Sequence, residues 1–116
     1  MIEDYSKEAK QLISNFIPKG IEFGKPKEYL FFRNKGLTEE KVFFDLKNCN
    51  GLEYVKKEKV DNEIRYTLYF IYKKSKGRAY CITFRDKIRI ITIFPLGRRT
   101  LNKYYKKRFK KTGGLK

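Results

Sequence analysis

The 116-residue sequence contains no histidine and only two cysteines. The absence of histidine excludes Ser-His-Asp triads, histidine general bases and histidine-containing metal sites. Cys49 and Cys81 are too few for a zinc site made of cysteines alone, and we expect two reduced, buried and inert thiols. If the protein is an enzyme, its proton transfers must use tyrosine, lysine, carboxylates or water.

Long apolar runs are also missing, because none approaches the roughly 18 residues that span a bilayer. The first five residues are acidic and do not resemble a signal peptide, so a cytoplasmic location without membrane contact is predicted. The glycine-rich nucleotide-binding motifs, HExxH and GxSxG are absent as well, and no cofactor or metal is expected.

Acidic residues are scarce in the second half of the chain. Residues 1–63 carry 12 Lys/Arg and 12 Asp/Glu, whereas residues 64–116 carry 17 Lys/Arg and a single acid, Asp86. The whole net charge of +16 therefore lies in the C-terminal 53 residues. Concentrated positive charge destabilises a compact domain and is typical of proteins that bind a polyphosphate.

The hydrophobic periodicity predicts a single α+β domain over residues 1–111, followed by a disordered tail at 112–116. We expect a four-stranded antiparallel meander covered by two N-terminal helices, with a basic helix at the C-terminus. The predicted helices span 4–16, 38–48 and about 100–111, and the predicted strands span 52–58, 64–73, 78–85 and 88–94. Turns are expected at 61–62, 75–77 and 86–87, and Pro95 is expected to end the sheet.

Cationic and phenolic side chains alternate along the last strands and the final helix. Phosphates require positive charge and unstacked bases require stacking surfaces, so this mixture favours single-stranded RNA. The predicted nucleic-acid-binding residues are Lys73, Arg85, Arg89, Arg98, Lys103, Tyr104, Lys106, Lys107 and Arg108.

This C-terminal half resembles the RelE-type toxins. The resemblance rests on Gly77-Arg78, the turn at Asp86-Lys87, the aliphatic strand 88–94, and Gly97-Arg98-Arg99 followed six residues later by Tyr105. Residues 32–42 are similar to the opening of small domains in another branch of the same superfamily. The resemblance implies a RelE-like fold and a toxin paired with an acidic antitoxin.

It also implies a metal-independent endoribonuclease, in which the 2′-hydroxyl of the RNA attacks the adjacent phosphorus. Such a reaction needs a proton acceptor, cations that stabilise the phosphorane and a proton donor for the leaving oxygen. A tyrosine whose pKa is lowered by dense positive charge can supply one proton transfer, and a lysine is the alternative. The residues to which the resemblance assigns catalysis are Arg99, Tyr105 and Arg78, supported by Lys74 and Lys76.

Other interpretations remain open at this point. The same charges suit a non-catalytic RNA- or DNA-binding module, or a protein that binds an acidic partner through residues 64–116. Tyr105 can pack the last helix onto the sheet, with Tyr104 as the functional tyrosine instead. Arg78 can form an ion pair with Asp86 or Glu63.

Overall fold

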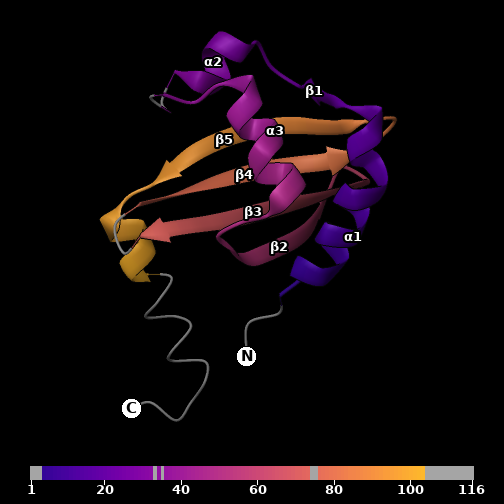
Figure 1. Ribbon diagram of the computed structural model, residues 1–116. Coiled ribbons are helices and arrows are strands. Elements are labelled where there is room, and N and C mark those ends of the chain that lie inside the picture. Colours follow the sequence, from indigo (N-terminus) through magenta and orange to yellow (C-terminus); the bar gives the residue numbers. More distant parts are fainter. Residues whose placement is uncertain (1–3, 33, 35, 74–75, 104–116) are drawn as a thin grey trace.

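A computed structural model describes residues 4–32, 34, 36–73 and 76–103 (Figure 1). Residues 98–103, after the last strand, are helical. The preceding elements are α1 (Ser6–Phe16), the 3-10 helix η1 (Ile17–Lys19), β1 (Ile21–Phe23), α2 (Lys27–Phe31), α3 (Glu39–Asn48), β2 (Leu52–Val60), β3 (Glu63–Lys73), β4 (Lys76–Phe84) and β5 (Ile88–Leu96).

The strands form one five-stranded mixed sheet in the order β1-β5-β4-β3-β2. The pairs β2–β3, β3–β4 and β4–β5 are antiparallel, whereas β1 pairs with β5 in parallel, with Ile21 opposite Ile88. The fold is α+β, but the prediction of a four-stranded antiparallel meander with two N-terminal helices was wrong. β1 and α2 have only three and five residues, too few to display a period in the sequence.

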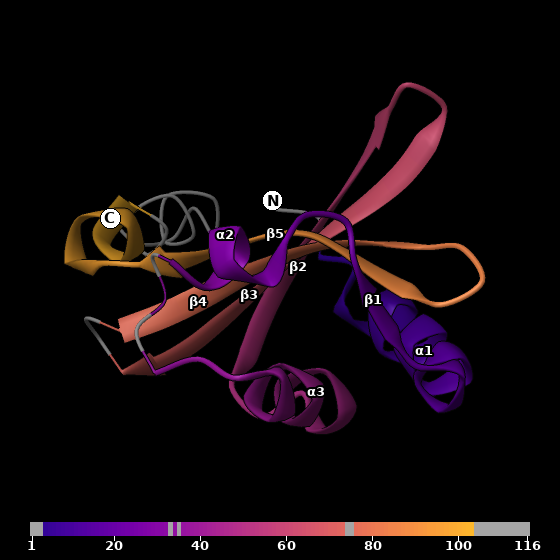
Figure 2. The same ribbon diagram turned by 90° about the horizontal axis from the view of Figure 1, so that it is seen from above.

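α1 and α3 cover one face of the sheet (Figures 1 and 2). Their apolar positions recur at helical spacing and turn toward the strands, as amphipathic helices require. Each large aliphatic or aromatic side chain buried there contributes roughly 1.5–3 kcal/mol. The fully buried members of this core include Ala9, Val42, Leu46, Leu68, Phe70, Tyr80, Ile82, Ile88 and Ile90.

Local sequence signals fix most element boundaries. Thr38 begins α3 as its N-cap, because its hydroxyl accepts a hydrogen bond from the Lys41 backbone N–H at 3.1 Å. Asp61 and Asn62 connect β2 to β3 with φ values of 51° and 65°, as expected for a two-residue hairpin turn. Pro95 lies inside β5 rather than ending the sheet. It is tolerated there because the pairing with β1 involves only residues 88–90, which leaves that edge of β5 unpaired beyond them.

The opposite face of the sheet carries a smaller core at the end where β5 finishes. Leu101, from the helical residues 98–103, packs against Ala79 and Leu96. Gly77 belongs to β4 rather than to the predicted turn at 75–77. A Cβ at this position would lie 2.6 Å from the Phe70 carbonyl oxygen, so only glycine fits between the two strands. Through the contacts of Leu101, the start of the predicted C-terminal helix is anchored to the sheet.

Candidate nucleic-acid interface

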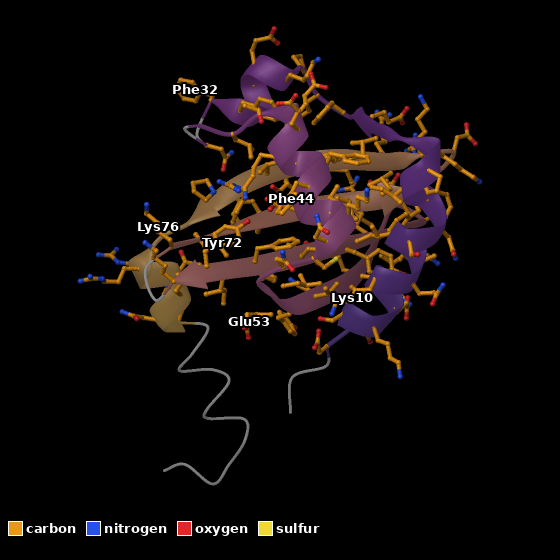
Figure 3. All side chains as sticks on the ribbon, viewed as in Figure 1. Lys10, Phe32, Phe44, Glu53, Tyr72 and Lys76 are labelled. Atoms are coloured by element: carbon orange, nitrogen blue, oxygen red, sulfur yellow. The ribbon has the colours of Figure 1, made fainter. Side chains whose placement is uncertain are left out.

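Five cationic side chains lie at the end of the sheet where β3 and β5 finish and β4 begins. Lys73 is the last residue of β3 and is the cross-strand partner of Lys76, the first residue of β4. Arg98, Arg99 and Lys103 lie on the helical segment that follows β5. Figure 3 shows Lys76 at this end of the molecule, next to that segment. We call these five residues the basic end.

The basic end has no acidic compensation within the described part of the chain. None of its five side chains takes part in any of the ion pairs found there. Gathering like charges without partners costs folding free energy, because the cations repel one another. A polyanionic ligand that replaces the missing carboxylates relieves this repulsion.

The helical part of the basic end surrounds an open hollow. Arg98, Arg99, Asn102 and Lys103 line a volume of about 450 Å³. Leu101, in the same turn, is buried against the sheet and holds the segment in place. The cations therefore remain in solvent while the backbone that carries them is fixed to the sheet.

Two predicted nucleic-acid-binding residues lie at the opposite end of the sheet. Arg85 follows β4 and donates to Glu63, with Nη2 and Oε2 2.6 Å apart. Arg89 lies near the start of β5 and donates from Nη1 to Glu22 Oε2 at 2.8 Å. Both guanidinium groups are already paired with carboxylates, so the structure does not bring them into the basic end.

Glu63 should make the stability of this opposite end sensitive to acid. Hydrogen bonds from Arg85 and then Arg65 lower the pKa of its carboxyl below the ordinary value of 4.5. A carboxyl with a lowered pKa stabilises the fold above its unfolded-state pKa, and this contribution is lost as pH falls through the folded pKa. Between pH 6 and pH 3 the melting temperature of Glu63→Gln should therefore fall less than that of the wild type. An equal fall would contradict this linkage.

Arg78 belongs to a polar network on the helix-covered face of the sheet. We define this network as Asp45 of α3, Tyr72 of β3, and Arg78 and Tyr80 of β4. The Asp45 carboxylate, 2% exposed, accepts hydrogen bonds from Tyr80 at 2.6 Å, Tyr72 at 3.1 Å and Arg78 Nη1 at 3.3 Å. The Lys41 ammonium approaches the same carboxylate at 3.5 Å. The partner of Arg78 is thus Asp45, not Asp86 or Glu63.

Four tyrosines of the sheet, including the two of this network, hold their protons firmly. Burial raises the pKa of Tyr66, Tyr69, Tyr72 and Tyr80, and that of Tyr72 reaches about 12. A neighbouring carboxylate adds to the effect at Tyr72 and Tyr80, because it disfavours a second negative charge. These four phenols are therefore suited to donate hydrogen bonds rather than to act as general bases.

Of the predicted catalytic residues that the structure describes, only two lie at the same end of the sheet. Arg99 and Lys76 both lie at the basic end, whereas Arg78 faces α3. Six predicted site residues lie outside the described part of the chain, as does the predicted tail 112–116: they are Lys74, Tyr104, Tyr105, Lys106, Lys107 and Arg108. The sequence analysis missed Asp45. Its signal was a carboxylate between Val42 and Leu46, on the apolar stripe of a helix.

The two cysteines are free thiols, and burial raises the pKa of both. Among the described residues no group of three or more Cys, Asp or Glu side chains is arranged to hold a metal ion. No helix in that part of the chain is long and apolar enough to cross a membrane.

Comparison with known proteins adds no relative. No protein-family model, curated protein or solved structure matches the chain significantly. The resemblance to RelE-type toxins therefore rests on the short sequence elements alone, and functional inference starts from the basic end.

Proposed function

We propose that the protein binds single-stranded RNA at the basic end and cleaves it as a RelE-like endoribonuclease. The observation that carries the proposal is the gathering of five cations without a carboxylate partner among the described residues. These cations come from β3, β4 and the segment after β5, which the fold brings to one end of the sheet. Their spread suits successive phosphates of one strand.

In the proposed reaction the 2′-oxygen of a ribose attacks the adjacent phosphorus and the 5′-oxygen of the next nucleotide leaves. The attacking hydroxyl gives its proton to a base and the leaving oxygen receives one from an acid, so a 2′,3′-cyclic phosphate and a 5′-hydroxyl result. Arg99 and Lys76 would stabilise the charge on the phosphorane. Tyr105, or alternatively Lys74 or Lys76, would transfer protons.

Arg78 has a different role in this proposal from the one that the resemblance implied. Its guanidinium is engaged by Asp45 and its side chain is only 18% exposed. It would therefore act as a positioning residue that holds β4 against α3, next to the RNA but not on the reacting phosphate.

Counterion release gives the first test of binding. Neutralising five phosphates predicts a slope of about −3.5 for log affinity against log salt, at roughly −0.7 per contact with a single strand. The triple variant Arg98→Ala, Arg99→Ala, Lys103→Ala should lower the magnitude of this slope by about 2. Fluorescence anisotropy with a labelled oligoribonucleotide measures both values. Arg85→Ala is the matched control, and a wild-type slope near zero would contradict nucleic-acid binding.

Cleavage needs a separate test, because a non-catalytic binding module would share every electrostatic feature with a nuclease. Incubation with total RNA or translating ribosomes, followed by mapping of 5′ ends, should reveal new 5′-hydroxyl termini. The engagement of Arg78 by Asp45 favours a second candidate, an RNA-binding protein without nuclease activity. Salt-dependent binding with intact RNA in both reactions would establish that alternative.

The proposal extends to an acidic antitoxin that covers the basic end, because masking the cations inhibits the site directly. Such a partner should compete with RNA. If the triple variant described above bound the partner as tightly as the wild type does, this extension would be wrong.

A further inference from the structure

Two partly exposed aromatic rings lie on the α3-covered face of the sheet and face the same cation. Tyr72, the penultimate residue of β3, is 39% exposed, and Phe44 of α3 is 47% exposed. The Lys41 ammonium lies 5.2 Å from the Phe44 ring centroid and 5.9 Å from that of Tyr72. Scattered exposed aromatics need no explanation, but two rings that share one cation form a defined site.

The position of this pair relates it to the RNA path. Tyr72 precedes Lys73 in the chain, and in Figure 3 it lies between Lys76 and Phe44. A strand whose phosphates contact Lys73 and Lys76 would therefore bring its next nucleotides over Tyr72 and toward α3. Rings placed directly beside a cationic phosphate track are the arrangement by which proteins hold unpaired bases.

The Tyr72 ring is held in place before any ligand arrives. Its hydroxyl donates to Asp45 at 3.1 Å, and the Arg78 guanidinium lies 5.6 Å from its ring centroid. The ring also passes close to Gly51, where an added Cβ would lie 3.3 Å from it. A fixed ring loses little conformational entropy when a base stacks on it.

Lys41 is the movable part of the site. Its side chain is 45% exposed, and its ammonium contacts Asp45 at 3.5 Å, a distance at which the ion pair is loose. The flexible side chain can turn from the rings to a phosphate oxygen, exchanging a cation–π contact for a charge-assisted hydrogen bond. This motion would open both ring faces to a base.

We infer that Tyr72, Phe44 and Lys41 form a base-stacking subsite, which holds an unpaired RNA base next to the phosphates bound at the basic end. The inference rests on the proposed RNA binding and adds to it the requirement for a base. Because a ring stacks on any base, the subsite favours unpaired over double-stranded RNA without selecting a sequence.

The test compares two probes, an oligouridylate and a ribose-phosphate chain of the same length without bases. Stacking contributes about 1–3 kcal/mol per base, so Phe44→Leu and Tyr72→Leu should each lower affinity for the oligouridylate about 5- to 150-fold. Affinity for the abasic chain should not change. Phe32→Leu, which removes a ring that is 83% exposed and belongs to neither the basic end nor the subsite, is the matched control and should bind the oligouridylate like the wild type.

A fluorescent variant reports stacking directly. The chain has no tryptophan, so Phe44→Trp introduces a single indole at the subsite. Its emission should be quenched by the oligouridylate and not by the abasic chain. Unchanged oligouridylate affinity in both leucine variants of the subsite, or equal losses on both probes, would overturn the stacking subsite alone. If the wild type bound neither probe, the proposed function and this inference would both fail.

Discussion

Replacing Arg99 with alanine should lower the rate of RNA cleavage by roughly 10²- to 10³-fold, the usual loss when one preorganised charge-stabilising group is removed. Arg99 lies in the open hollow at the basic end and has no ion-pair partner among the described residues. Its removal should therefore leave the melting temperature within about 2 °C of the wild type, since exposed substitutions rarely change stability by more than about 0.5 kcal/mol. Cleavage rate is measured on an end-labelled oligoribonucleotide under single-turnover conditions.

Arg85→Ala is the control for this experiment, because it also removes one exposed arginine but at the far end of the sheet. It should cleave at the wild-type rate, and any loss of stability would reflect its contact with Glu63. Arg99→Lys separates charge from geometry, since lysine keeps the charge but cannot form a bidentate contact with a phosphate. If Arg99→Ala and Arg85→Ala slowed cleavage equally, the effect would be one of net charge and the catalytic assignment of Arg99 would be wrong.

The elements that the sequence predicted well are those whose pattern is local. α1 and α3 display helical spacing within a few turns, and Thr38 marks the start of α3. The alternation in β3 continues over 11 residues, long enough to be recognised. β1 could not be predicted in the same way, because its pairing joins Ile21 to Ile88 across most of the chain. Three residues between glycines carry no period of their own.

The sequence predicted cations along the last strands, and the antiparallel pairing of β2 to β5 divides them between the two ends of the sheet. Consecutive strands in a meander run in opposite directions, so cations that are close in sequence are divided between the two ends of the sheet. Lys73 and Lys76 fall at one end with Arg98 and Arg99, whereas Arg85 falls at the other. Charge segregation in the sequence thus predicted a basic surface, but the division between its ends depends on register.

The assignment of Arg78 shows a second limit of sequence reasoning. An arginine after a glycine at the start of a strand satisfied the RelE-like pattern, and nothing local distinguished a catalytic cation from a buried one. The distinguishing residue is Asp45, which is 33 positions away in sequence and belongs to a helix. A carboxylate on an apolar helix stripe requires a buried partner, and tyrosines and arginine on the facing strands are suitable donors.

Replacing Asp45 with alanine should have the largest effect on stability, a loss of about 3–5 kcal/mol in the free energy of unfolding. The change leaves Arg78 without its carboxylate partner and removes the acceptor for the phenols of Tyr72 and Tyr80. Urea denaturation followed by circular dichroism measures the loss, and the midpoint should move at constant slope.

The double variant Asp45→Leu, Arg78→Met distinguishes a network that positions elements from one that takes part in the reaction. Replacing both charges with apolar side chains removes the unpaired guanidinium, so the double variant should recover the part of the stability loss that comes from Arg78. The buried phenol of Tyr80 still lacks its acceptor, and that part of the loss should remain. If Arg78 only positions β4 against α3, the double variant should also cleave RNA within about tenfold of the wild-type rate. A stable double variant whose cleavage rate has fallen 10²-fold or more would instead show that Arg78 contacts the reacting phosphate, as the RelE-like pattern implied. Asp45 would then be the group that orients Arg78 toward the phosphate.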